Sequence, residues 1–137
     1  MTGDEHQAER LAPLVGRALA DADLDAYADL LHPDVRWGAP GDPSPPCQNR
    51  AQVLAWYRNG REAGTRARVT ETVVAGDRIL VGLHVTGTPA EAALGDGSDR
   101  WQVLTVRDGM VADIRGFESR DEAAAAAGLQ CRDQDRA

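Results

Sequence analysis

The stretch RWQVLTVRDGMVADIRGF, residues 100–117, decides the fold of this chain. Apolar and polar residues alternate on both sides of Asp108-Gly109, a dipeptide that is typical of a two-residue hairpin turn. The pattern predicts two antiparallel strands, at residues 101–107 and 110–117.

A second pair of strands precedes the first. Residues 68–75 and 78–86 alternate in the same way and meet at Gly76-Asp77, so they predict another hairpin. Residues 87–99, between the two pairs, are mostly small and carry no hydrophobic repeat, and we expect them to form a mobile loop.

Helices are predicted on either side of these strands. Thr2 to Glu5 fits a capping box, and apolar residues then recur at helical spacing. Asp23 can cap a second helix, which must end before Pro33. Ser119 to Glu122 is a capping box for a short final helix of alanines. The apolar residues of the first two helices are Leu11, Leu14, Val15, Ala18 and Leu19, and then Leu24, Tyr27, Leu30 and Leu31.

A short strand and a proline-rich loop separate the second helix from the third. The strand is predicted at residues 35–37, and the stretch APGDPSPPCQ at residues 39–48 holds four of the seven prolines. Proline fixes φ and has no backbone N–H, so this stretch is predicted to be a rigid surface loop. Asn49 with Gln52 then opens the third helix.

Composition narrows the class of protein. A formal charge of −7, from 15 basic and 22 acidic residues, disfavours nucleic acid as a partner because its phosphates would be repelled. No apolar run could act as a signal peptide or cross a bilayer, so we expect one cytoplasmic domain without membrane contact. Three dispersed histidines and two isolated cysteines, Cys47 and Cys131, form no metal-ligand pattern, and we expect no metal and no cofactor.

Four stretches follow one another in the chain: ADADLDAYADLLHPDVRWGAP, CQNRAQVLAWY, GDRILVGLHVTGT and WQVLTVRDGMVADIRGF. In order and spacing they resemble the nuclear transport factor 2-like superfamily, and especially its bacterial SnoaL-like members. The resemblance spans roughly residues 6–127. It implies an α+β fold of the cystatin-like type, a cone-shaped, curved antiparallel sheet with helices packed on its concave face. It also implies a pocket between sheet and helices and, frequently, a homodimer. We expect this domain at residues 1–129 and a disordered tail at residues 130–137.

The superfamily includes ketosteroid isomerases, polyketide cyclases, epoxide hydrolases, dehydratases and non-catalytic carriers, so the resemblance indicates architecture better than activity. At the position of the carboxylate base of ketosteroid isomerases this chain has Ala39, before Pro40. Their second acid is matched by Gln102, and their first-helix tyrosine by apolar residues near Leu14. Gln102 can donate a hydrogen bond to a carbonyl but cannot abstract a proton, so steroid isomerisation by the known machinery is not expected.

Asp113 and Arg115 lie two residues apart on the last predicted strand and therefore share a face. The carboxylate, arginine, carboxylate arrangement of limonene epoxide hydrolase-like relatives is not evident in this sequence. An ion pair in solvent accounts for these two residues.

His84 is the side chain suited to proton exchange near neutral pH, and we take it as the candidate catalytic acid or base. It shares one strand face with Leu80 and Gly82, while Ile79 and Val81 belong to the other. Hydrophobicity alone makes the second face the core and leaves His84 in water. The superfamily resemblance implies instead that the face of His84 turns toward the pocket, and both placements remain open.

The resemblance also suggests residues that would bind a ligand. Trp37 and Tyr57 match positions that flank the cavity, at the end of the first strand and on the third helix. Gln102 and Tyr27 could position a ligand oxygen. Glu118 lies next to the mouth, where it could pair with the histidine or merely precede the last helix. For the aromatic residues, packing in the core is the alternative.

Two classes of function follow. The first is an enzyme that acts on a small apolar or polycyclic molecule by proton transfer at His84; the second is a non-catalytic ligand-binding or scaffold module of the same fold. The missing carboxylate base favours binding or an atypical mechanism, whereas the isolated histidine favours an enzyme. In either case we expect a homodimer formed through the sheet, because apolar and β-branched residues occupy both faces of the strands within residues 69–85.

Overall fold

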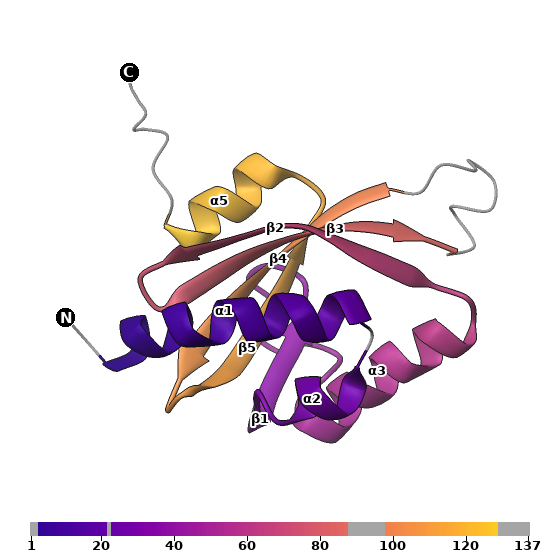
Figure 1. The fold of residues 1–137 in the computed structure, drawn as a ribbon, viewed down its shortest axis with the longest axis horizontal. Helices are drawn as coiled ribbons and strands as arrows, with labels where there is room; N and C mark the ends of the chain where they lie inside the picture. The colour runs from indigo at the N-terminus through magenta and orange to yellow at the C-terminus, as the bar shows by residue number, and fades with distance from the viewer. Residues whose placement is uncertain (1–2, 22, 88–97, 129–137) are drawn as a thin grey trace.

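The computed structural model describes residues 3–21, 23–87 and 98–128 (Figure 1). Helices and strands account for most of these residues. In chain order they are α1 Gly3–Asp21, α2 Leu24–Ala28, β1 Leu31–Gly38, α3 Arg50–Glu62, β2 Arg66–Ala75, β3 Arg78–Thr86, β4 Ser98–Arg107, β5 Met110–Phe117 and α5 Arg120–Ala127.

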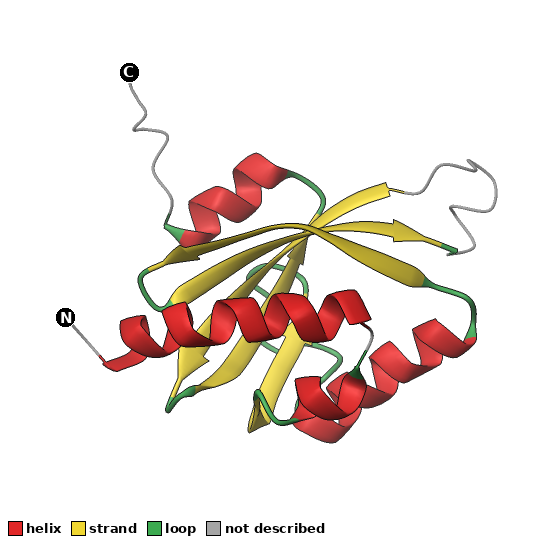
Figure 2. Cartoon of the chain, viewed as in Figure 1, coloured by secondary structure: helices red, strands yellow, loops and turns green. Residues whose placement is uncertain are grey.

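The strands form one curved, unclosed sheet in the order β1-β5-β4-β3-β2 (Figure 2). β2, β3, β4 and β5 each pair antiparallel with the next strand in the chain. This agrees with the two hairpins predicted from the alternating residues. Asp108 and Gly109, between β4 and β5, have φ of 58° and 77°, the backbone that a tight hairpin turn of this type requires. The predicted α+β fold with a curved sheet is confirmed.

β1 begins earlier than the sequence pattern indicates. The second helix is predicted to run up to Pro33, but α2 ends at Ala28 and Leu31 is already the first residue of β1. β1 lies at the edge of the sheet and pairs with β5 in parallel, with a shift of register between Leu31 and Arg36. An edge strand with such an irregularity accommodates Pro33, because its missing N–H interrupts no continuous ladder.

Helices lie on both faces of the sheet. α1, α2 and α3 cover the concave face, called the inner face below, and α5 covers the outer face (Figure 1). The prediction of helices on the concave face is thus right for α1 to α3, and α5 adds a layer behind the sheet. The main core lies under α1 to α3 and includes Leu11, Val15, Tyr27, Val53, Ile79, Val81, Leu104, Val106, Val111 and Ile114.

A smaller apolar cluster holds α5 on the outer face. It consists of Leu80 on β3, Val103 on β4, and Ala123 and Ala127 on α5. Residues 79–83 of β3 are therefore buried without interruption, because alternate side chains enter the two cores.

Side chains cap three helices as predicted. The oxygens of Asp23, Asn49 and Ser119 accept hydrogen bonds from backbone N–H groups in the first turns of α2, α3 and α5. The capping residue predicted at Thr2 and the tail at 130–137 lie outside the described residues, as does most of the predicted loop. Of the helices that are described, none is long and apolar enough to cross a membrane.

Candidate functional site

Four of the predicted ligand-binding residues come together on the inner face of the sheet. The side-chain amide of Gln102 donates a hydrogen bond of 3.0 Å to the hydroxyl of Tyr57. The ring of Tyr27 meets that of Tyr57 edge-on, with centroids 5.5 Å apart. The hydroxyl of Tyr27 and the indole N–H of Trp37 lie near enough to the Tyr57 hydroxyl to lower its pKa, although neither is placed to form a regular hydrogen bond with it. Tyr27, Trp37, Tyr57 and Gln102 are called the inner polar cluster below.

Strand alternation and helical spacing place these residues. Gln102 pairs with Val81 of β3 and with Gly116 of β5, and all three positions belong to the inner face. A Cβ added to Gly116 would lie 3.9 Å from the indole of Trp37, so the glycine keeps the space beside Gln102 open. Tyr57 follows the buried Val53 by one turn of α3 and therefore points toward the same core.

Two members of the inner polar cluster are buried, and the other two, Trp37 and Tyr57, are partly buried. Tyr27 is fully buried, and Gln102, 6% exposed, is the one polar or charged residue that is buried among those the structure describes. A buried amide is uncommon unless its polar atoms find partners. The cluster therefore sets a small number of polar groups in an apolar interior, while the hollows of about 230 and 250 Å³, on the outer face and between α1 and α2, are lined by other residues.

Three polar atoms of this cluster are buried without a hydrogen-bond partner among the described residues: the hydroxyl of Tyr27, Nε1 of Trp37 and Oε1 of Gln102. Each such atom costs about 1–3 kcal/mol of folding free energy. The hydroxyl and the indole N–H can donate, and Oε1 can accept. If the oxygen and nitrogen of the Gln102 amide were exchanged, the nitrogen would lack a partner instead of the oxygen. One polar atom of the amide is therefore unpaired in either orientation. These atoms are hydrogen-bonding groups that no other described residue satisfies.

Burial makes the hydroxyls of Tyr27 and Tyr57 weaker acids than an exposed tyrosine. It is the largest cause of the raised pKa of Tyr27, followed by the neighbouring Tyr57. Burial likewise raises the pKa of Tyr57, and the hydrogen bond from Gln102 lowers it by less. Both residues therefore remain neutral at physiological pH and act as hydrogen-bond donors, so the cluster can hold and polarise an oxygen but has no group ready to remove a proton.

The structure separates His84 from the inner polar cluster. His84 lies on the outer face with Leu80, and its Nδ1 is 2.8 Å from a carboxylate oxygen of Asp99. Of the two placements left open by the sequence, the pocket placement implied by the superfamily resemblance is wrong, because alternation along β3 sends Val81 inward and residue 84 outward. The hydrophobicity of β3 indicates this face correctly, whereas the superfamily resemblance does not.

Glu118 also lies outside the cluster. Its side chain is 84% exposed and pairs with Arg100 at 2.9 Å, at the end of the sheet. An exposed carboxylate in an ion pair contributes little to a buried site. The predicted role of Glu118 in ligand binding is therefore not supported by its position.

Trp56 belongs to the same region, although the sequence does not single it out for the site. Its ring stacks on Trp37 with centroids 4.3 Å apart and meets Tyr57 edge-on at 5.4 Å. About half of Trp56 is exposed. In the sequence, Trp56 is marked only by its position directly before Tyr57. One residue along an α-helix turns the side chain by about 100°, so Trp56 lies beside the face that carries Tyr57.

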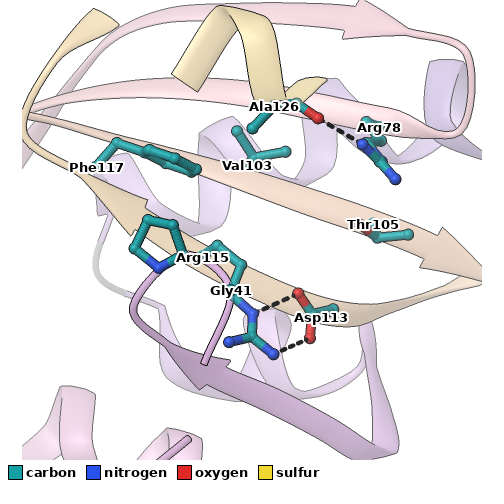
Figure 3. A pocket seen from close by; sticks show the side chains of 9 residues that line it. Gly41, Arg78, Val103, Thr105, Asp113, Arg115, Phe117 and Ala126 are labelled. Atoms are coloured by element: carbon teal, nitrogen blue, oxygen red, sulfur yellow. Dashed lines mark hydrogen bonds and ion pairs between the residues drawn. The ribbon is translucent and has the colours of Figure 1, made fainter. Parts of the chain in front are cut away.

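A hollow of about 230 Å³ opens on the outer face of the sheet (Figure 3). Arg115 donates two hydrogen bonds to the carboxylate of Asp113, at 2.9 and 3.1 Å. The two side chains are only 16% and 28% exposed, so the pair is not an ion pair in solvent and that prediction is wrong. The hollow is lined by Pro40, Gly41, Arg78, Val103, Thr105, Asp113, Arg115, Phe117 and Ala126.

The charged groups of this outer hollow already have partners within the protein. Nη1 of Arg115 donates to the carbonyls of Ala39 and Asp42, both at 2.8 Å, and Arg78 donates to the carbonyl of Ala126 near the end of α5. In the described part of the chain no three histidine, cysteine, aspartate or glutamate side chains gather where a metal ion could bind. The inner polar cluster, with its unpaired atoms, is therefore the better candidate for a functional site.

Comparison with known protein families shows what the chain is related to. Residues 14–114 match the model of the SnoaL-like domain, which is more than half of the chain. The chain belongs to the SnoaL-like domain family. All four residues of the inner polar cluster fall inside the matched region, and the predicted resemblance is confirmed.

Solved structures share the fold. A ketosteroid isomerase-like protein from Kribbella flavida superposes with a TM-score of 0.67 at 24% identity, over 85% of this chain and 81% of its own. A polyketide cyclase-like protein from Xanthomonas campestris gives 0.65 at 19%, over 91% and 99%. An epoxide hydrolase of the LEH-like type from M. tuberculosis gives 0.61 at 16%, over 93% and 89%. These likenesses show the fold alone, and no curated protein matches the sequence.

Proposed function

We propose that this SnoaL-like protein binds a small, mostly apolar molecule at the inner polar cluster and orients it through one oxygen. The observation that carries the proposal is the set of three buried polar atoms, on Tyr27, Trp37 and Gln102, that lack partners among the described residues. A ligand oxygen that met them would remove several kcal/mol of desolvation cost, at about 1–3 kcal/mol for each atom.

The donor and acceptor pattern indicates the kind of polar group. A hydroxyl is the simplest match, since its oxygen can accept from Tyr27 or Trp37 and its hydrogen can be donated to Gln102. Aliphatic and aromatic side chains surround these atoms on the inner face. They favour an apolar or polycyclic body, whose burial supplies most of the affinity.

The cluster supports binding better than proton transfer. It contains no histidine or carboxylate, and burial raises the pKa of both phenols. The names of similar structures, ketosteroid isomerase and polyketide cyclase, point to apolar molecules that carry oxygen, which agrees with a polar group set in an apolar wall. We therefore favour a ligand-binding module over an acid-base enzyme for this chain.

A homodimer through the outer face of the sheet is the second part of the proposal. α5 covers only part of that face, and Trp101 and Phe117 stay half-buried beside it. A copy of the same chain would cover these rings symmetrically. Light scattering across the micromolar range tests this point, and a monomer at every concentration would remove it.

Three naphthalenes test the proposed ligand site. 2-Naphthol can donate and accept a hydrogen bond, 2-methoxynaphthalene can only accept, and 2-methylnaphthalene can do neither, while the apolar body is the same. We expect 2-naphthol to bind at least about tenfold more tightly than 2-methylnaphthalene, which corresponds to about 1.4 kcal/mol, with the methoxy compound between them. Calorimetry measures the affinities, and backbone NMR shifts locate the site.

Tyr27→Phe supplies the matched control, because it removes one hydroxyl and leaves the ring against Tyr57. It should lower the affinity for 2-naphthol about fivefold to tenfold and leave that for 2-methylnaphthalene unchanged. Equal affinities for all three compounds, or NMR shifts confined to the outer face, would contradict the proposal.

A further inference from the structure

We infer that Arg115, with Asp113 beside it, is a positioning residue for Trp37: it holds residues 39–46 against the sheet and so fixes one wall of the inner polar cluster. The ligand part of this inference rests on the proposed function. Its structural part does not, and it can be tested without any ligand.

The loop needs donors from elsewhere in the chain. Its prolines have no N–H, so its carbonyl groups outnumber the donors that it can supply itself. Side chains at both ends of the loop provide them: Arg36 donates to the carbonyl of Pro43, and Gln48 donates to that of Pro45. These side chains add to the loop's own backbone hydrogen bond from Asp42 to Ala39.

Arg115 makes the contact that joins this loop to the middle of the sheet. Its Nη1 reaches the carbonyls of Ala39 and Asp42, and the opposite edge of the guanidinium is fixed by Asp113 (Figure 3). Hydrogen bonds from a charged donor are roughly twice as strong as neutral ones. Because the carboxylate holds the guanidinium in one orientation, two carbonyls three residues apart are held at once.

The loop is in turn tied to Trp37. The backbone groups of Trp37 and Cys47 exchange hydrogen bonds of 3.0 and 3.3 Å, which close the loop at its base. Gly38 packs against Pro45 so tightly that a Cβ on the glycine would lie 2.4 Å from the Cβ of the proline. A displacement of the loop therefore moves the backbone that carries Trp37.

The loop also passes from one face of the sheet to the other. Trp37 lies in the inner polar cluster, whereas Pro40 and Gly41 form one wall of the outer hollow. Gly38 pairs with Arg115 across β1 and β5, so the guanidinium is attached where the loop leaves the sheet. A contact on the outer face can in this way set the position of an indole on the inner face.

The stacked rings of Trp37 and Trp56 give a spectroscopic signal that reports the position of Trp37. A general loss of stability does not change this signal while the protein stays folded. In a Trp101→Phe background, the near-ultraviolet circular dichroism of the indoles comes from Trp37 and Trp56, whose rings are 4.3 Å apart. In that background we compare Arg115→Met with Arg120→Met. Arg120 also holds a carboxylate with two hydrogen bonds, at 2.6 and 3.1 Å to Glu71, but it lies at the start of α5.

We expect Arg115→Met to lose at least half of the near-ultraviolet signal and to bind 2-naphthol about tenfold more weakly. Arg120→Met should keep both within about twofold, and urea unfolding measures how much stability each variant loses. Arg115→Lys retains the charge but cannot hold two carbonyls and a carboxylate together, so it should give the same pattern, and it replaces Arg115→Met if that variant does not fold.

An unchanged near-ultraviolet signal in Arg115→Met and Arg115→Lys would overturn the inference. So would an equal loss of signal in Arg120→Met, because the effect would then be general. If the wild-type protein binds none of the naphthalenes, the proposed function fails while the spectroscopic comparison still decides the role of Arg115. If it binds 2-naphthol and Arg115→Met binds it equally well, the positioning role alone fails.

Discussion

Gln102 on β4 and Tyr57 on α3 are 45 residues apart in the chain, yet the amide of one donates to the hydroxyl of the other across 3.0 Å. This hydrogen bond joins the sheet to the helix layer within the apolar inner core. It satisfies one end of the amide and leaves the other end buried and unpaired among the described residues. The unpaired oxygen costs the free protein stability, which the proposed ligand would restore.

Replacing Gln102 should separate the two properties. Gln102→Leu removes both the hydrogen bond to Tyr57 and the unpaired Oε1, so the two effects on folding oppose each other. We expect the free energy of unfolding to change by less than about 1.5 kcal/mol, while affinity for 2-naphthol falls at least about tenfold. Urea unfolding and calorimetry measure these quantities. A loss of several kcal/mol with unchanged affinity would assign Gln102 a purely structural role.

Alkaline pH should destabilise the protein through its buried phenols and thiol. Burial raises the pKa of Tyr27, Tyr57 and Cys47 in the folded state, so the unfolded chain loses these protons first. The contribution of these three groups to stability is therefore constant below their unfolded pKa values, about 8.5 for the thiol and about 10 for the phenols, and falls above them. Each phenol contributes a slope of about 1.4 kcal/mol per pH unit within its window.

The alkaline range is simple to interpret because all 15 basic residues are arginine, so no lysine titrates there. Tyr27→Phe should make the loss of stability shallower by the share of one phenol. Urea unfolding between pH 9 and pH 11, with phenolate absorbance recorded in parallel, gives the slopes. An identical slope in the variant would mean that Tyr27 ionises as readily folded as unfolded.

His84→Ala should leave ligand binding intact. The imidazole lies on the outer face beside Asp99, across the sheet from the inner polar cluster. We expect affinity for 2-naphthol to stay within about twofold of the wild-type value, since no group in the cluster contacts the outer face of β3. Calorimetry on the purified variant checks this, and a tenfold loss would restore His84 as a candidate for the site.

Two glycines with positive φ should respond differently to alanine. Gly87 and Gly41 have φ of 83° and 73°, so either alanine variant costs about 1–2 kcal/mol from backbone strain. At Gly87 a Cβ would also lie 2.1 Å from the carbonyl oxygen of Gly64, whereas at Gly41 no atom lies within 4 Å. We expect Gly87→Ala to be more destabilising by roughly 1–3 kcal/mol. Equal midpoints in thermal unfolding would show that the backbone at residues 64 and 87 separates easily.

The alternating strands, the Asp108-Gly109 turn and the caps at Asn49 and Ser119 are all predicted from the sequence. Each depends on residues a few positions apart, whose spacing and backbone preferences act locally. The same local pattern also indicates which side of β3 faces the main core. The family resemblance added helices packed on the concave face of a curved sheet, with Trp37, Tyr57 and Gln102 turned toward the space between them.

Contacts between distant segments decided the rest. β1 extends through Pro33 because it pairs with β5, about 80 residues further on, and α5 finds its place because Leu80 and Val103 leave an apolar patch behind the sheet. Asp113 and Arg115 look like a solvent pair along one strand, and only the loop folded over them makes them a partly buried ion pair. Most of the elements could be read from the sequence alone, because propensity and periodicity are local. Tertiary packing decided which polar atoms remain unpaired, because that depends on what the whole chain brings to each of them.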